Sequence, residues 1–260
     1  MKPALRHIIS AVFLLILLAW LSVFLGVSAK KKGDAVCNGL KVTVLDSAKN
    51  SFVSSGEICS YLGKELGEII GKPLGDLDLT AIENMVDAGS AVLKSEAYTT
   101  TDGYLNVLVT QREPAVRFQG GTGGFYADRN GYVFPLQRNY TSDVPVIDGY
   151  IPVKIPAGYK GEVPDETGRK WLQDILDMTG FMDRSRVWAR NIVQISVQED
   201  GDIIMIPREG KEKFIFGSPE GFEEKFGRME KYYTAVKPSK EEGYYSSVNV
   251  KYEGQIICRR

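Results

Sequence analysis

The sequence predicts an α+β fold, in which a single transmembrane helix is followed by a β-α-α-β-β module and then by a β-rich domain with a C-terminal edge strand. Three observations support this prediction. Residues 8–27 form one uncharged apolar run, residues 36–112 alternate between strand-like and helix-like patterns, and residues 113–260 are mostly strand-like with turn dipeptides between the strands. Each pattern has the period of one kind of element, so the element order follows from the sequence.

The apolar run is long enough to cross a bilayer. A helix rises about 1.5 Å per residue, so about 20 residues span a hydrocarbon core. We therefore expect a transmembrane helix at residues 8–28, after a short cytoplasmic tail at 1–7. The alternative is a cleavable signal peptide, since Val27-Ser28-Ala29 resembles a cleavage site, but the run is longer than a usual signal core. Lys30–Lys32 follow the run, which leaves the topology ambiguous from charge alone.

The next 77 positions, 36–112, have the pattern of a small mixed module. Ser54 lies three residues before Glu57, and Thr80 lies three residues before Glu83, which predicts two helices that each begin with a capping box. Pro73 is expected to end the first helix. The expected strands are Leu40–Leu45, Ala91–Thr99 and Tyr104–Thr110, with an Asp-Gly turn between the last two.

The remaining residues, 113–260, predict a β-rich domain with few helices. Two helices are expected, near Asp165–Met178 and Gly221–Tyr233, from apolar residues at helical spacing. Turn dipeptides separate the expected strands from one another. The expected strands are Gln111–Val116, the Phe125–Leu136 hairpin, Val187–Val197, Ile203–Pro207, Lys213–Phe216, Tyr245–Tyr252 and Gln255–Cys258. A chain that ends in β-structure often ends at a sheet edge, although an internal strand fits the same pattern.

The composition argues against an enzyme without excluding one. His7 is the single histidine and it precedes the apolar run, so the rest of the chain lacks the usual general base and the commonest metal ligand. We expect no catalytic residue, no metal and no cofactor. Lys and Arg total 32 against 33 Asp and Glu, so the chain has no broad positive field and we expect no nucleic-acid partner.

Two polar or glycine-rich stretches have alternative interpretations. Gly120–Gly124 could suggest a phosphate cradle, but it lacks the Lys-Ser/Thr of a P-loop and we interpret it as a loop. Glu199–Asp202 has the acidic density of a calcium-loop fragment, but the residues that follow it lack the later calcium ligands, and we interpret it as a hairpin turn.

In an oxidising compartment Cys37 and Cys59 can form a disulfide that leaves Cys258 free; the alternative is three unpaired thiols.

Three short motifs, in order, carry a family resemblance. Val109–Ala115 is similar to a strand that runs into an "R/E-x-P-A" joint, and Tyr126–Phe134 is similar to a "D-x-x-G-x-x-F" hairpin. Val248–Tyr252 is similar to a closing "V-D-L-R-Y" strand, with Asn249 in place of the usual acid. These motifs and the element order resemble the bacterial cell-division family FtsQ, called DivIB in Gram-positive bacteria. The module at 36–112 resembles a POTRA domain.

The resemblance implies a non-enzymatic divisome scaffold in the bacterial cytoplasmic (inner) membrane, with the bulk of the chain periplasmic at the division septum. It implies that the chain recruits FtsB-like and FtsL-like coiled-coil proteins, and that the FtsB-like partner adds a strand beside the last strand. Other divisome membrane proteins would meet the POTRA-like part. The partner-binding residues implied by the resemblance are Tyr252, Gln255, Ile256, Ile257, Cys258 and Arg190.

Two other functions remain open from the sequence. One is a POTRA-containing envelope transport or assembly component, for which a β-barrel or repeated POTRA units would be expected. The other is a membrane-tethered envelope hydrolase that works with carboxylates, for which a paired-acid motif would be expected. The sequence shows neither feature, so the scaffold is the preferred prediction.

Overall fold

The computed structural model describes residues 12–23, 35–67, 69–120 and 123–260. The chain divides into two compact units, each with its own hydrophobic core. The first unit comprises Met1–Lys49 and Val53–Gln111, and the second comprises Asn50–Phe52 and Arg112–Arg260.

The described residues include only part of the predicted membrane span. Of residues 8–28, those at 12–23 are described, and they form a helix with exposed side chains. The other residues of the span and the predicted tail at 1–7 lie outside the described residues. No helix in the described part of the chain is long and apolar enough to cross a membrane.

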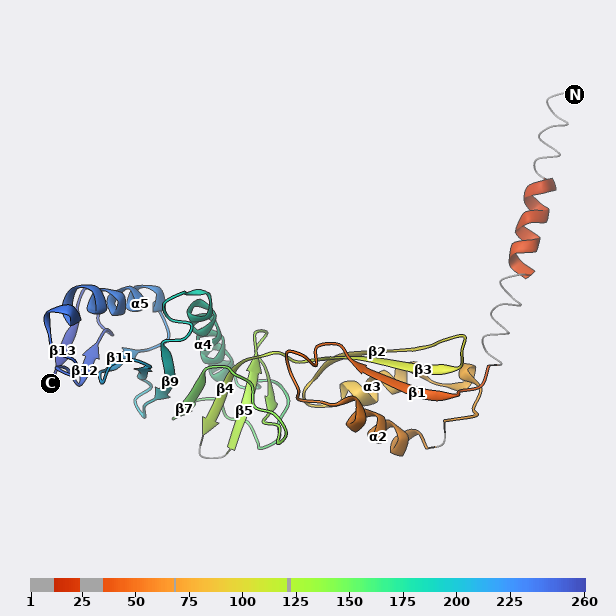
Figure 1. Ribbon diagram of the computed structural model, residues 1–260, viewed down its shortest axis with the longest axis horizontal. Coiled ribbons are helices and arrows are strands. Elements are labelled where there is room, and N and C mark those ends of the chain that lie inside the picture. The colour runs from red at the N-terminus through yellow and green to blue at the C-terminus, as the bar shows by residue number, and fades with distance from the viewer. Residues whose placement is uncertain (1–11, 24–34, 68, 121–122) are drawn as a thin grey trace, which may run out of the picture. The chain divides into compact units, whose positions relative to one another are not determined.

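The first unit is a three-stranded sheet with two helices on one face (Figure 1). Its strand order is β1-β3-β2, in which β1 runs parallel and β2 antiparallel to β3. The elements follow the predicted β-α-α-β-β order, and they are β1 (Gly39–Val44), α2 (Ser55–Leu66), the 3₁₀ turn η1 (Leu74–Asp76), α3 (Leu79–Asp87), β2 (Val92–Thr99) and β3 (Tyr104–Gln111). The central strand β3 buries Leu105, Val107 and Val109 completely.

The start of α2 is as predicted, but its end is not. The Glu57 N–H donates to Ser54 Oγ over 3.2 Å and the Ser54 N–H donates to Glu57 Oε2 over 3.0 Å, which is the expected capping box. The helix ends at Leu66, because Gly67 has a φ of 64° and a ψ of −150°, which lie outside the helical region and are accessible to glycine. The prediction that Pro73 ends the helix is therefore wrong.

The predicted capping box of the second helix is also wrong. The N-cap of α3 is Asp78, whose Oδ1 accepts from the Ala81 N–H over 2.9 Å. The Glu83 carboxylate instead accepts a hydrogen bond from the Ala97 N–H of β2 over 2.7 Å. An acidic side chain one turn into α3 thus ties the helix to the sheet that it covers.

The second unit is built on a ten-stranded sheet. The strand order is β13-β12-β11-β10-β9-β7-β4-β5-β6-β8. The strands are β4 (Pro114–Gly120), β5 (Gly123–Asp128), β6 (Tyr132–Pro135), β7 (Val146–Gly149), β8 (Gly161–Glu162), β9 (Ile192–Val197), β10 (Ile203–Pro207), β11 (Lys213–Gly217), β12 (Ser247–Asn249) and β13 (Ile257–Arg259).

Two helices and a π-helical turn complete the second unit. They are α4 (Glu166–Arg184), α5 (Phe222–Lys231) and η2 (Tyr232–Val236), followed by the 3₁₀ turn η3 (Lys237–Ser239). In Figure 1, α4 lies near β4 and β9 and α5 lies near β11 to β13. Phe226 of α5 packs its ring 5.0 Å from that of Phe216 and 5.4 Å from that of Trp188, measured between centroids, and all three are buried. This aromatic cluster joins α5 to the sheet.

Several predicted boundaries change in the second unit. The strand expected at 187–197 begins only at Ile192, because the chain forms turns up to Asn191. The strand expected to run into Val116 instead begins at Pro114, where a proline at the first position costs no ladder hydrogen bond. The short strands β7 and β8 were not predicted. The Glu199–Asp202 turn is confirmed, because the Gly201 N–H donates to the Gln198 C=O over 3.0 Å.

The three cysteines are free thiols in the structure. Cys37 is buried, Cys59 is exposed and Cys258 is partly buried. The structure therefore does not pair Cys37 with Cys59.

Candidate functional site

The candidate site is the outer edge of β13, the last of the described strands. β13 stands at one end of the strand order, and β12 is its neighbour among the described strands. The two strands are antiparallel, with Val248 opposite Cys258 and Asn249 opposite Ile257. Of the two interpretations that the sequence allowed, the structure thus has the edge strand rather than the internal strand.

The direction of the backbone groups follows from one hydrogen bond. The Arg259 C=O accepts from the Ser246 N–H over 2.8 Å, so this carbonyl faces the β12 side. Backbone groups of successive residues in a strand point to opposite edges. Cys258 therefore directs its N–H and C=O away from β12, toward the side on which no further described strand lies. A partner strand could pair with these groups.

Side chains alternate across the same strand. Ile256 and Cys258 pack against the core of the second unit. Ile257 is 38% exposed, and Arg259 is exposed on the same face. An added strand would therefore meet a covered apolar face on one side and an Ile-Arg pair on the other.

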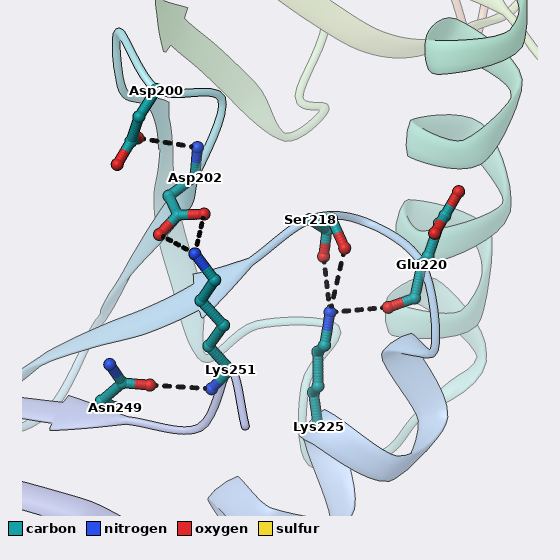
Figure 2. Close-up of polar contacts among 7 residues, drawn as sticks. All are labelled: Asp200, Asp202, Ser218, Glu220, Lys225, Asn249 and Lys251. Carbon is teal, nitrogen blue, oxygen red and sulfur yellow. Dashed lines mark hydrogen bonds and ion pairs between the residues drawn. The ribbon is translucent and has the colours of Figure 1, made fainter. Parts of the chain in front are cut away.

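A turn between β12 and β13 sets the start of the edge strand. The Lys251 N–H donates to Asn249 Oδ1 over 2.9 Å, and Gly254 has the positive φ of 66° that reverses the chain. The Lys251 ammonium lies 2.7 Å and 2.8 Å from the two carboxylate oxygens of Asp202, at the start of β10 (Figure 2). This ion pair holds the turn against a strand two places away from β12 in the sheet.

The structure places five of the six predicted partner-binding residues at or just before the edge strand. Ile257 and Cys258 lie in β13. Gln255 and Ile256 precede the strand, because β13 covers residues 257–259 instead of the predicted 255–258. Tyr252 is 51% exposed in the turn, where the Gln255 N–H donates to its C=O over 3.4 Å.

Arg190 does not join this group. It was expected in a strand, but it lies in the turn before β9 and its side chain is exposed. Its C=O accepts from Arg208 Nε over 2.9 Å. In the strand order β10, β11 and β12 separate β9 from β13, so a contact between Arg190 and the edge would need a partner that crosses the sheet.

Two charged residues beside the edge are not among the partner-binding residues that the resemblance implied. Lys213 of β11 and Arg259 of β13 both stand opposite Ser247 of β12, so they share one face of the sheet. Both are exposed. The alternation from Ile256 to Arg259 could have assigned Arg259 to the solvent face, but only the parallel pairing of β11 with β12 shows that Lys213 is in the same row.

Two titratable side chains at and behind this edge have raised pKa values. Burial raises the pKa of the Cys258 thiol, so it is protonated at neutral pH and is a poor nucleophile. Burial, with the Glu212 carboxylate nearby, raises the pKa of Tyr232 to about 12, so this phenol is neutral as well. Within the described residues, no cluster of three His, Cys, Asp or Glu side chains is placed to hold a metal ion.

Comparison with known families decides the identity. A family model described as FtsQ/DivIB, C-terminal related, matches residues 113–259, more than half of the chain. The chain belongs to the FtsQ/DivIB family. A model of a POTRA-like domain matches residues 35–110 of this FtsQ/DivIB-family protein. No curated protein matches the chain.

Membership in the FtsQ/DivIB family gives the chain a role in cell division and in interactions among divisome proteins. The family is one of non-enzymatic division scaffolds. The resemblance predicted from the sequence is thereby confirmed, both for the family and for the POTRA-like domain.

The FtsQ/DivIB motifs have structural roles in this chain. Asp128 of the hairpin motif is buried, and its Oδ2 lies 2.8 Å from Arg112 of the joint motif. Its other oxygen, Oδ1, accepts from the N–H groups of Asn130 and Tyr132 over 2.9 Å and 3.1 Å. One carboxylate therefore fixes both the hairpin turn and the entry to the β domain.

Proposed function

We propose that this chain is a non-enzymatic divisome scaffold that recruits FtsB-like and FtsL-like coiled-coil partners during septum formation, by adding a partner strand to β13. The observation that supports this proposal most directly is the outward-facing backbone of Cys258 at the end of the sheet. Main-chain pairing would give affinity, and Tyr252, Gln255, Ile256 and Ile257 would give specificity.

The energy available from backbone pairing alone is small. Of the three residues of β13, only Cys258 directs its backbone groups outward, which allows about two hydrogen bonds. Each such bond contributes about 0.5–1.5 kcal/mol net, so pairing supplies only a few kcal/mol. The exposed side chains of Tyr252 and Ile257 must therefore add contact area for a specific complex.

We also propose that residues 8–28 anchor the chain by a single pass in the bacterial cytoplasmic (inner) membrane, with the bulk of the chain periplasmic. The support is the length of the uncharged run from Ile8 to Val27. Other divisome membrane proteins would then meet the POTRA-like unit close to the bilayer. Alkaline extraction of membranes tests the anchor, because a chain released into the soluble fraction would not be held by a spanning helix.

A proline substitution tests strand addition at the point where the geometry is most specific. Cys258→Pro removes an outward N–H without removing a hydrogen bond to β12. Cys258→Ala is the matched control, since it removes the thiol and keeps the N–H. The full chain is used as bait on native membranes, and recovery of small coiled-coil division proteins is measured for the wild type and both variants.

We expect the alanine variant to recover these proteins like the wild type, and the proline variant to lose them. Circular dichroism and thermal melting of both variants check that the β domain is folded. Equal recovery by a folded Cys258→Pro variant would refute strand addition at β13, and a wild type that recovers no such proteins would refute the proposed partners.

A further inference from the structure

A concave surface lies in the second unit, apart from β13. It is a cleft of about 400 Å³ that none of the predicted partner-binding residues lines. Its walls come from Tyr150 after β7, the first half of α4, the β9–β10 turn and the loop from β11 to α5. Four separate segments thus converge on one shallow, open depression.

The apolar part of the cleft is aromatic. Tyr150 is 64% exposed, so most of its side chain is accessible to a ligand. Trp171 of α4 also lines the cleft, and it packs against the buried core residue Phe118 with 5.9 Å between ring centroids. Trp171 is therefore fixed from behind, while the Tyr150 ring is available to a ligand.

The polar part of the cleft is acidic. Three carboxylates line it, those of Asp174, Glu199 and Glu220, against one ammonium, that of Lys170. The Lys170 Nζ lies 3.1 Å from Asp174 and 3.2 Å from Glu220, so it is shared between two of the acids. Among the described residues Glu199 has no ion-pair partner, and the side chain of neighbouring Asp200 accepts only from the Asp202 N–H in its own turn.

Two lysines hold the loops of the cleft in place, as Figure 2 shows. Lys225 is 7% exposed, and its Nζ donates to the Ser218 C=O over 2.8 Å and to the Glu220 C=O over 2.6 Å. Lys251 pairs with Asp202 at the end of the β9–β10 turn. Because both loops are already ordered, a ligand would meet little ordering cost in this cleft.

We propose that this cleft docks a basic segment of a protein partner, with an arginine side chain over Tyr150 and against Glu199. A planar guanidinium matches both features, because it stacks on an aromatic ring and pairs with a carboxylate through parallel N–H donors. The net negative charge of the lining disfavours phosphates, nucleic acid and anionic lipid headgroups. The inference does not depend on strand addition, since the cleft and β13 share no residue.

A peptide-binding experiment on the full chain in detergent tests the docking proposal. The probe is a fluorescent, end-blocked Gly-Arg-Gly-Arg-Gly peptide, and the comparison probe carries citrulline in place of arginine, which keeps the shape and removes the charge. Binding is measured by fluorescence anisotropy at low and high salt. The variants are Glu199→Lys and Tyr150→Ala, with Glu223→Lys as the matched charge reversal, since Glu223 is exposed on α5 outside the cleft.

We expect Glu199→Lys to weaken binding of the arginine peptide about tenfold or more, because attraction becomes repulsion. Tyr150→Ala should weaken it about two- to fivefold, as loss of one exposed cation–π contact would. Glu223→Lys and Cys258→Pro should leave it unchanged. Equal binding of the citrulline peptide, or equal loss in Glu223→Lys, would overturn the proposal. Self-association of the chain that Glu199→Lys abolishes would instead make a second copy the occupant, and would also refute it.

Discussion

The ion pair between Glu212 and Lys237 gives the sharpest prediction about what keeps the C-terminal region folded. Glu212 is 2% exposed and lies just before β11. Its Oε1 lies 2.9 Å from Lys237 Nζ, and its Oε2 accepts from the Lys211 N–H over 3.0 Å. The change Lys237→Met keeps the length of the side chain and removes the charge. It would leave a buried carboxylate without a counter-ion.

The expected cost can be estimated from burial and contacts. Removing one partner of a fully buried ion pair costs about 3–5 kcal/mol. Lys237 is partly exposed, with 28% of its side chain accessible, which reduces the cost to about 2–3 kcal/mol because water can reach the site. The ammonium also lies 4.9 Å from the Tyr233 ring centroid, and that contact contributes about 0.5–1 kcal/mol. We therefore expect Lys237→Met to lower the free energy of unfolding by about 3 kcal/mol.

Urea unfolding followed by tryptophan fluorescence measures this cost. Of the three tryptophans, Trp20 lies in the apolar run and Trp171 and Trp188 belong to the second unit, so the change in signal on unfolding reports mainly on the unit that carries the mutation. The control is Lys231→Met, an exposed lysine at the end of α5, which should change stability by less than about 0.5 kcal/mol.

A double mutant separates the buried charge from general damage. Glu212→Gln with Lys237→Met removes both charges, so it should be more stable than Lys237→Met alone by about 1 kcal/mol or more. The reasoning is refuted if Lys237→Met costs no more than Lys231→Met. It is also refuted if the double mutant is less stable than the single mutant by the full cost of Glu212→Gln.

Two further predictions concern the second unit. The raised pKa of Tyr232, about 12 instead of 10.0, means that the unfolded phenol ionises first, so its stabilisation is complete below pH 10 and is lost as the pH rises toward 12. Tyr232→Phe should flatten this alkaline loss of about 1.4 kcal/mol per pH unit, and an unchanged slope in urea unfolding would contradict the assignment. Asp128→Ala should lower the free energy of unfolding by about 3 kcal/mol, because it leaves Arg112 unpaired and frees the hairpin turn. Asp128→Asn keeps one oxygen that can accept from the Asn130 and Tyr132 N–H groups and loses the acceptor for Arg112, so it should cost less than Asp128→Ala; equal costs in the same assay would argue against the hairpin contacts.

Features of this fold could be predicted where they depend only on residues a few positions apart in the sequence. The Ser54–Glu57 capping box needs only residues three apart, and it forms as predicted. The Asn130-Gly131 hairpin turn could be predicted for the same reason, since Gly131 supplies the positive φ of 80° that the turn requires. The predicted capping box at Thr80 and Glu83 does not form, because the Glu83 carboxylate accepts a tertiary hydrogen bond from the Ala97 N–H instead.

Long-range features could not be predicted from the sequence. β7 has four residues and pairs in parallel with both β4 and β9, and nothing in those four residues indicates their neighbours. The same limit applies to the candidate site. The apolar pattern at 256–258 predicted a strand, but its place at the end of the sheet depends on β12 pairing with β11, which is a property of the whole unit. The cleft beside Tyr150 also needs four segments that are distant in the chain.

The two ends of the ten-stranded sheet differ in a way that favours β13 as the edge for a partner. At the other end, β8 has only two residues, and Gly161 has a φ of 136° outside the strand region. The Tyr159 hydroxyl donates to the Glu162 C=O over 2.6 Å, so a side chain already occupies an acceptor of β8. β13 has no such cover on its outer backbone among the described residues, and its exposed flank is protected by charge at Arg259 rather than by a capping side chain. A short, charged edge resists non-specific pairing while remaining open to a partner with a matching strand, which is what the proposed strand addition requires.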